Sequence, residues 1–449
     1  MLHAVSESRG GASVRSRPRL PTLLTSAGAR SGLVLLVCSL AGHIGNYLYY
    51  VLAARLLTPA EFAEVSAITG LATIAFMPAT GVQAALARDT AALEARGRGE
   101  EGRALHRAVA RRMALVQAGV LVLLVLGTPA AVAVLDLTSA WVWLVGAAWL
   151  VLGMGLYVGL GARQGREQFG VVAAVLGGPM GVFRPLLLVP LALLGGVVGA
   201  LGAMVAATVA GLVLLVDRRH DRPAGTSVPP LPEVRTALVA LAAFASLTNI
   251  DLLVGKVVLG PTEAGLYASA ALLGKIALYG PSALALVLLP KVTARLESGL
   301  SVRRPALLVM AATVLTGAVV AATIALAPAS LVTGVFGVAY AGAYALAAPL
   351  AVAMTLLALV HVHIMVSLAR RDRVLIVLVA LAAVAQAAGL LLLGDSPGRM
   401  VLVTTVVAAA TLALHELTSP YGLVRLALRE PAAHGSSPVP ARTSHEESR

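Results

Sequence analysis

The chain has 449 residues, of which 59% are apolar and only 12% are charged, and its formal net charge is +13. Soluble domains contain about 45–50% apolar and about 25% charged residues, so this composition excludes a soluble protein. Twelve membrane-spanning helices of about 20 residues each would use about 240 residues, which is close to the apolar content of the chain. The basic excess does not predict nucleic-acid binding, because in membrane proteins it usually marks cytoplasmic loops.

Apolar stretches between charged or Pro/Gly-marked breaks predict an all-α integral membrane protein with about twelve transmembrane helices. In chain order the predicted spans cover residues 31–54, 65–87, 113–135, 141–161, 171–191, 197–216, 236–258, 266–289, 306–327, 344–368, 374–393 and 400–420. The first apolar run is too long for a signal-peptide core, so we expect an uncleaved first span. Residues 1–30 and 421–449 are expected to be disordered cytoplasmic tails.

The distribution of basic residues predicts the orientation of the spans. Almost all of the 34 lysines and arginines fall in the two tails and in alternate loops, whereas only Arg55 and Arg399 fall in loops on the other side. By the positive-inside rule the basic side is cytoplasmic, which places both termini there. The charge-rich segment 88–112 is expected to be the longest cytoplasmic connection of the first half, and the longest external connection is about 328–343.

A repeat divides the chain into two halves. The segment LTPAEFAEVSA at 57–67 follows the first span, and LGPTEAGLYASA at 259–270 follows the seventh span, so Leu-x-Pro-x-Glu recurs after 202 residues. The proline-rich segment 217–235 between the halves is predicted to be a cytoplasmic linker. Because each half has an even number of spans, the lobes 31–216 and 236–420 are expected to be parallel repeats about an axis along the membrane normal.

These segments resemble a known family. Residues 53–79 and 247–292, with the words Ala-Arg-Leu-Leu-Thr-Pro at 54–59 and Glu-Ala-Gly-Leu-Tyr at 263–267, are similar to the polysaccharide flippases of the multidrug/oligosaccharidyl-lipid/polysaccharide (MOP) exporter superfamily, which include the Wzx-type O-antigen flippases. The resemblance implies two six-helix lobes facing each other across a cavity that opens alternately to either side. It also implies transport of undecaprenyl-diphosphate-linked oligosaccharide across the bacterial cytoplasmic membrane.

Charged residues inside spans are functional candidates, because each costs about 2.5–3.5 kcal/mol on insertion scales. Arg184, Lys275 and Asp251 are predicted at similar depth, in the outer half of the bilayer. A guanidinium or ammonium there can replace part of the lost hydration of a lipid diphosphate, so Arg184 and Lys275 are candidate head-group contacts. Two structural alternatives stay open. Lys275 can form an ion pair with Asp251, and Arg184 can bond to carbonyls freed by the kink at Pro185.

Asp251 is the candidate for ion coupling, through a proton or a sodium ion, and it lies beside Asn249, a further candidate cavity residue. His43 and Asn46, three apart on one helix face, are expected either to line the cavity or to bond a neighbouring helix. Arg88, at the inner end of the second span, is a candidate contact for an anionic head group on the cytoplasmic side. Lys256 is expected to snorkel to the outer interface.

No metal site or cofactor is predicted. The single Cys38 offers no metal spacing, His361 and His363 point to different faces of their helix, and His415 and Glu416 are expected to lie at the cytoplasmic interface. The sequence also shows no nucleotide-binding motif and no nucleophile with its base.

Two other functions remain open from the sequence. One is an integral-membrane polymerase or ligase of the same pathway, which is disfavoured because the short external loops carry only scattered carboxylates. The other is a multidrug or other small-molecule secondary exporter. A drug-cation exporter is expected to present acidic groups, whereas the intramembrane charges here are mainly basic. Membrane lipids, a lipid-linked oligosaccharide and contacts with glycan polymerases or glycosyltransferases are the expected partners.

Overall fold

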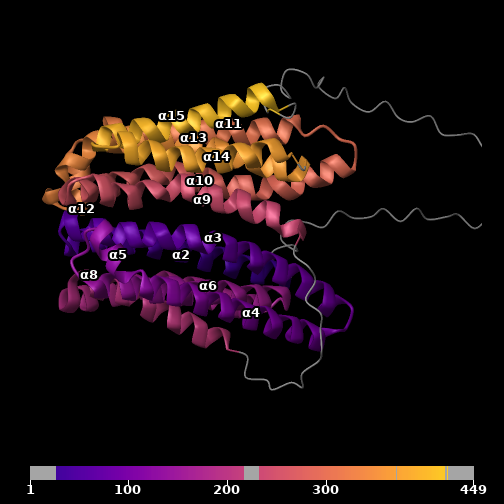
Figure 1. The fold of residues 1–449 in the computed structure, drawn as a ribbon. Helices are drawn as coiled ribbons and strands as arrows, with labels where there is room; N and C mark the ends of the chain where they lie inside the picture. Colours follow the sequence, from indigo (N-terminus) through magenta and orange to yellow (C-terminus); the bar gives the residue numbers. More distant parts are fainter. Residues whose placement is uncertain (1–26, 217–231, 371, 420–421, 423–449) are drawn as a thin grey trace, which may run out of the picture.

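The computed structural model describes residues 27–216, 232–370, 372–419 and 422, and this part of the chain is helical without strands. The predicted tails and the linker 217–235 therefore lie almost entirely outside the described residues. The helices form two bundles that lie side by side, one from each half of the chain (Figure 1). We call them the first lobe and the second lobe.

Within the described residues each lobe has seven α-helices, and the fourth of each is short. The first lobe contains α2 (Ala27–Leu56), α3 (Pro59–Ala95), α4 (Gly99–Leu126), α5 (Thr128–Val134), α6 (Ala140–Gly165), α7 (Phe169–Gly177), the π-helical η1 (Gly178–Phe183) and α8 (Arg184–Leu215). The second contains α9 (Pro232–Val258), α10 (Pro261–Glu297), α11 (Arg303–Leu326), α12 (Ser330–Phe336), the 3₁₀-helical η2 (Val338–Ala343), α13 (Tyr344–Arg370), α14 (Arg373–Leu393) and α15 (Pro397–Thr418).

The repeat seen in the sequence extends to whole helices. Helices α3 and α10 are both 37 residues long, and α10 begins 202 residues after α3. The short helices α5 and α12 are both 7 residues long and have the same separation. The prediction of two parallel repeats is thus confirmed at the level of helix boundaries.

The described residues contain about twelve spans. Ten helical segments are long and apolar enough to cross a membrane, and one of them, Phe169–Leu215, is 47 residues long. Its backbone leaves the helical region at Gly195 and Gly196, where Gly196 has φ 52°, and there the chain turns back. A β-carbon on Gly199 would lie 1.8 Å from the main-chain oxygen of Leu191, which shows how closely the two arms pack. With α10, these two arms bring the number of spans to the predicted twelve.

The repeated Leu-x-Pro-x-Glu motif is a helix start. Thr58 is the N-cap of α3 with Pro59 in the first turn, and its hydroxyl accepts a hydrogen bond from the Glu61 main-chain nitrogen over 3.3 Å. The Glu61 carboxylate in turn accepts from the Thr58 main-chain nitrogen over 2.8 Å. This capping box satisfies two main-chain donors that the helix leaves free. In the second lobe Gly260 takes the N-cap position before Pro261, so the motif marks the same turn twice.

Some predicted loops are helical instead. The prediction that segment 88–112 is a long connection is wrong. Helix α3 runs to Ala95 and α4 begins at Gly99, which leaves a three-residue turn. Its alanines, leucines, arginines and glutamates are good helix formers, so the high charge of this segment is compatible with helix on both sides of the turn. The predicted span 113–135 likewise divides at Gly127 into α4 and α5, and the external segment 328–343 holds α12 and η2.

The lobes meet mainly through α3, which packs against both α9 and α10. The turns α2–α3 and α9–α10 lie at one end of the bundle, which we call the outer end. The turn α3–α4 and the ends of α8 and α15 lie at the other, which we call the basic end (Figure 1). At the outer end a β-carbon on Gly265 would lie 2.0 Å from the main-chain oxygen of Pro59, so glycine is required for this approach of the lobes.

Candidate functional site: two buried polar clusters

Close backbone packing places Arg184 beside α2. A β-carbon on Gly45 would lie 2.3 Å from the main-chain oxygen of Gly181, and one on Gly42 would lie 2.8 Å from that of Leu176. Only glycine at these positions lets α2 and η1 approach so closely. Arg184 follows directly as the first residue of α8 and is therefore held against the middle of α2.

Arg184 forms the first-lobe cluster together with Asn46 and the tyrosines around it. Its side chain is 8% exposed, and Nη1 donates a hydrogen bond of 2.8 Å to Oδ1 of Asn46. Tyr49, Tyr50 and Tyr157 lie in the surroundings of the charge of Arg184. Within the described residues its Nε has no hydrogen-bond partner. The guanidinium is thus bound by a side-chain amide rather than by carbonyls freed at Pro185, and it keeps a donor unused.

The second-lobe cluster joins Lys275 and Asp251 to separate partners. Lys275 is 6% exposed and donates from Nζ to Oδ1 of Asn249 over 2.9 Å. Asp251 is fully buried, and its Oδ2 accepts a hydrogen bond of 2.9 Å from the hydroxyl of Tyr267. Lys275 and Asp251 interact electrostatically, but among the described residues they form no ion pair within 4.0 Å. The two groups are therefore bound by different side chains, Asn249 and Tyr267.

The Asp251 side of this cluster extends to α14 and α15. Tyr267 also interacts with Thr404, which lies 3.5 Å from Nε2 of Gln386. Gln386 donates a second bond, of 3.0 Å, to the main-chain oxygen of Leu247. Within the described part of the chain, Oδ1 of Asp251 and Oε1 of Gln386 are buried oxygens without a hydrogen-bond partner. Buried acceptors of this kind suit a proton or a small cation.

The two clusters lie at matching depth. Asn46 is ten residues before the end of α2 at Leu56, and Asn249 is nine residues before the end of α9 at Val258, so both are about 15 Å from the outer end. The predicted common depth of Arg184, Lys275 and Asp251 agrees with this arrangement.

His43 and Arg88 do not join these clusters. His43 is an exposed residue of α2, one turn before Asn46. Arg88 is exposed in the part of α3 that approaches the basic end, where its Nε lies 3.0 Å from Asp89. Their proposed contacts with substrate therefore rest on exposure alone, whereas those of Arg184, Lys275, Asn46 and Asn249 rest on shared geometry.

Contacts that join the lobes at the outer end were not foreseen from the sequence. Lys256 is 5% exposed and donates from Nζ to the main-chain oxygen of Asp136 over 2.9 Å, so the expectation that it snorkels to the interface is wrong. A second contact runs from the first lobe to the second. Arg55 donates hydrogen bonds to the main-chain oxygen of Val335, over 2.8 Å, and to that of Gly334. Their acceptors are main-chain oxygens near the ends of α5 and α12, and no sequence motif marks them.

Comparison with known proteins identifies the fold. No family model matches the chain, and no curated protein is similar to it in sequence. An inward-facing multidrug resistance MATE family transporter of the MOP superfamily matches with a TM-score of 0.68 and 14% identity, over 88% of this chain and 98% of that one. The lipid II flippase MurJ in an inward closed conformation matches with a TM-score of 0.62 and 10% identity, over 89% of this chain and 90% of that one.

A third comparison gives the same fold. An outward-facing MATE family transporter of the MOP superfamily matches with a lower TM-score of 0.57, at 14% identity, over 91% of this chain and 99% of that one. This chain has the fold of the MOP superfamily transporters, and it is a multi-pass membrane protein.

Proposed function

We propose that this protein is a flippase that moves a lipid-linked oligosaccharide, carried on undecaprenyl diphosphate, across the bacterial cytoplasmic membrane by alternating access of its two lobes. One observation carries the proposal: each lobe buries one cation at the same depth, Arg184 in the first and Lys275 in the second, and each is held by an asparagine. A diphosphate that enters between the lobes would meet one cation on each side.

The unused donors of these cations support an anionic ligand. An ammonium has three donors and a guanidinium has five, whereas the described contacts of each group use one side-chain acceptor, Asn249 or Asn46. Charge-assisted hydrogen bonds to phosphate oxygens are shorter and stronger than neutral ones. Displacement of the asparagine oxygens, or addition to them, would compensate part of the hydration that a diphosphate loses on entering the membrane.

Asp251 is proposed as the residue that couples transport to an ion. Its free Oδ1 lies in a cluster with Tyr267, and the buried Oε1 of Gln386 belongs to the same extended network. A proton or a sodium ion bound there would change the charge beside Lys275, and so change the attraction of the second-lobe cluster for an anion. The coupling of ion and substrate would then be electrostatic.

Transport in the native host tests the proposal. Deletion of the gene is expected to cause undecaprenyl-diphosphate-linked oligosaccharide to accumulate on the inner leaflet, and a plasmid copy of the wild type is expected to clear it. Copies carrying Arg184→Gln or Lys275→Met are expected to fail, whereas Lys291→Met, which removes an exposed lysine from the same helix as Lys275, is expected to clear it. Clearance by the Arg184 and Lys275 variants at wild-type levels would refute a cationic head-group site.

A small-molecule exporter is the second candidate, because a multidrug resistance MATE family transporter has a TM-score of 0.68 to this chain. A drug cation requires an acidic binding surface, and Asp251 is the only carboxylate of the two clusters. If deletion left all lipid-linked sugars unchanged but made cells sensitive to cationic drugs, the exporter would be the correct function. Accumulation of flipped but unpolymerised product outside would indicate an enzyme of the pathway instead.

A further inference from the structure

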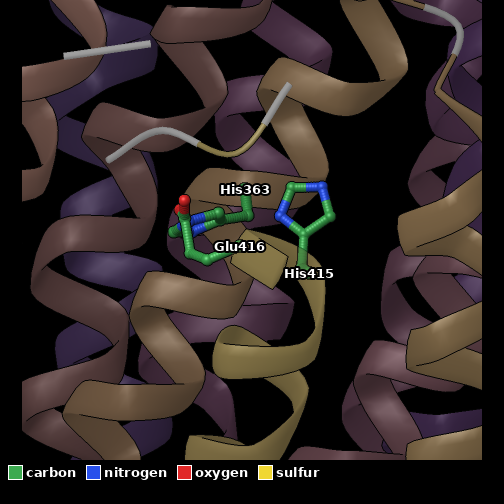
Figure 2. Close-up of side chains that lie close together, drawn as sticks. All are labelled: His363, His415 and Glu416. Atoms are coloured by element: carbon green, nitrogen blue, oxygen red, sulfur yellow. The ribbon is translucent and has the colours of Figure 1, made fainter. Parts of the chain in front are cut away.

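A group of metal-ligating side chains lies at the basic end of the second lobe, apart from both polar clusters. His363 of α13 faces His415 and Glu416 of α15, as Figure 2 shows. One ligand atom of each residue lies within 4.8 Å of the others. The two histidines are 3% and 1% exposed, and the Glu416 side chain is 20% exposed, so the group is buried but can be reached from the basic end.

Hydrogen bonds fix which nitrogen of each imidazole faces the group. Nδ1 of His363 donates a hydrogen bond of 2.8 Å to the main-chain oxygen of Leu359. The ligand atom of His363 is therefore Nε2, which lies 3.0 Å from Oε1 of Glu416. Nε2 of His415 lies 3.3 Å from Oδ2 of Asp372. The other ring nitrogen of His415, Nδ1, then points toward His363 and Glu416 (Figure 2).

That nitrogen is the observation that points to a ligand. Nδ1 of His415 is buried and has no hydrogen-bond partner within the described part of the chain. A buried polar atom without a partner costs about 1–3 kcal/mol. A metal ion would satisfy it, because neutral imidazole binds metals through its free lone pair.

The residues behind the group are those expected around a metal-bound histidine. Asp372 is the N-cap of α14, and it accepts bonds from the Val374 main-chain nitrogen over 2.9 Å and from the Ser419 hydroxyl over 2.7 Å. Its carboxylate is therefore held in place behind His415. Metal-ligating histidines almost always donate their second N–H to a carboxylate or a main-chain carbonyl, and here one histidine has each.

We propose that His363, His415 and Glu416 bind a zinc ion that joins α13 to α15 at the basic end. Two imidazoles and one carboxylate are a zinc ligand set, with a water molecule as the fourth ligand, and they disfavour calcium and magnesium, which take oxygen ligands. In a tetrahedral site with bonds of about 2.0–2.1 Å the ligand atoms are roughly 3.4 Å apart. Side-chain rotations on binding would bring the three ligand atoms, which lie within 4.8 Å of one another, to this separation.

Metal binding by the purified full chain tests the proposal. The protein is isolated in detergent through a tag without histidine, stripped with a chelator and titrated with ZnCl2, and the stripped protein is also titrated with Co²⁺, whose visible absorption reports tetrahedral coordination. We expect one Zn²⁺ per chain, and loss of this site in His415→Gln and His363→Gln. Asp372→Asn is expected to weaken binding by about 10–100-fold. His361→Gln is the matched control, since His361 is on the same helix but stacks on Phe244.

The outcome is decisive in either direction. Absence of a stoichiometric site in the wild type, or equal binding by wild type and His415→Gln, would overturn the proposal. If the histidine variants do not elute as a single species in size-exclusion chromatography, Glu416→Gln replaces them, because its partly exposed side chain tolerates change. Unchanged binding in Glu416→Gln would then reject the site.

Discussion

Lys256 of α9 and Asp136, which follows α5, join the two lobes through a hydrogen bond of 2.9 Å between the ammonium and a main-chain oxygen. The ammonium is almost fully buried, so this bond is made inside the protein rather than at its surface. Hydrogen bonds to charged groups contribute about 1.5–3 kcal/mol. The bond therefore stabilises the contact between the two lobes at the outer end.

Lys256→Met is expected to shift the conformational equilibrium toward an open outer end by about 10–150-fold, the factor that corresponds to about 1.5–3 kcal/mol. Spin labels on Ala140→Cys and Thr262→Cys, exposed residues at the outer end of either lobe, measure the separation in a Cys38→Ser background. The mean distance should increase relative to the unsubstituted pair. Lys291→Met, the same chemical change at an exposed position of α10, is the control. Identical distance distributions for the Lys256 variant and the control would contradict the prediction.

Asn46→Ala removes the amide that accepts a hydrogen bond from Arg184 and leaves a buried guanidinium group without that partner. We expect a loss of about 1–3 kcal/mol in the free energy of unfolding, seen as a lower midpoint of thermal unfolding in detergent. His43→Ala, one turn earlier on the exposed side of α2, is expected to change stability by less than about 0.5 kcal/mol. Equal midpoints for the two variants would mean that Arg184 does not depend on Asn46.

Gly45→Ala places a methyl group 2.3 Å from the main-chain oxygen of Gly181, and neither backbone can move without separating α2 from η1. The expected result is a poorly folded protein or a loss of more than about 2 kcal/mol, which is typical of overpacking. Gly119→Ala in α4 is the matched control, because no atom lies within 4 Å of its added β-carbon. That variant is expected to be neutral or more stable by up to about 1 kcal/mol. Thermal unfolding and expression level measure both.

Asp251→Asn should abolish the dependence of transport on an ion gradient while the protein still folds, because the amide is nearly the same size as the carboxylate. Transport of the lipid-linked oligosaccharide is measured in vesicles, once under an imposed proton gradient and once under an imposed sodium gradient. This comparison distinguishes the two ions. The wild type is expected to respond to one of them, and Asp251→Asn to neither. A wild type that ignores both gradients would remove Asp251 from the mechanism, while leaving the head-group site unaffected.

The sequence predicted the architecture well because hydrophobic length and charge asymmetry act locally. The turn at Gly195 and Gly196 was placed correctly between two spans, and the Leu-x-Pro-x-Glu repeat gave the separation of 202 residues that whole helices follow. The errors came from charge. The high charge of segment 88–112 predicts a loop, but most of this segment is helix in α3 and α4.

Contacts between distant residues were the part that the sequence could not supply. The sequence places Arg184 and Lys275 inside apolar stretches. Their asparagine partners depend on how α2 packs on η1 and how α9 packs on α10. The Lys256 bond has a main-chain acceptor, which has no signature in the sequence. His363 and Glu416 are on different helices, and only the packing of α13 on α15 brings them together.

The equal length of α3 and α10 has a mechanical consequence. A helix of 37 residues is about 55 Å long, against a hydrocarbon thickness of about 30 Å, so each extends well past the membrane toward the basic end. Both start at the outer end, where Gly265 touches Pro59. A rotation of about 10° around that contact would move the far tip of either helix by about 10 Å for a length of about 55 Å. In the proposed alternating access, the two long helices would turn a small change at the outer end into a wide movement at the basic end.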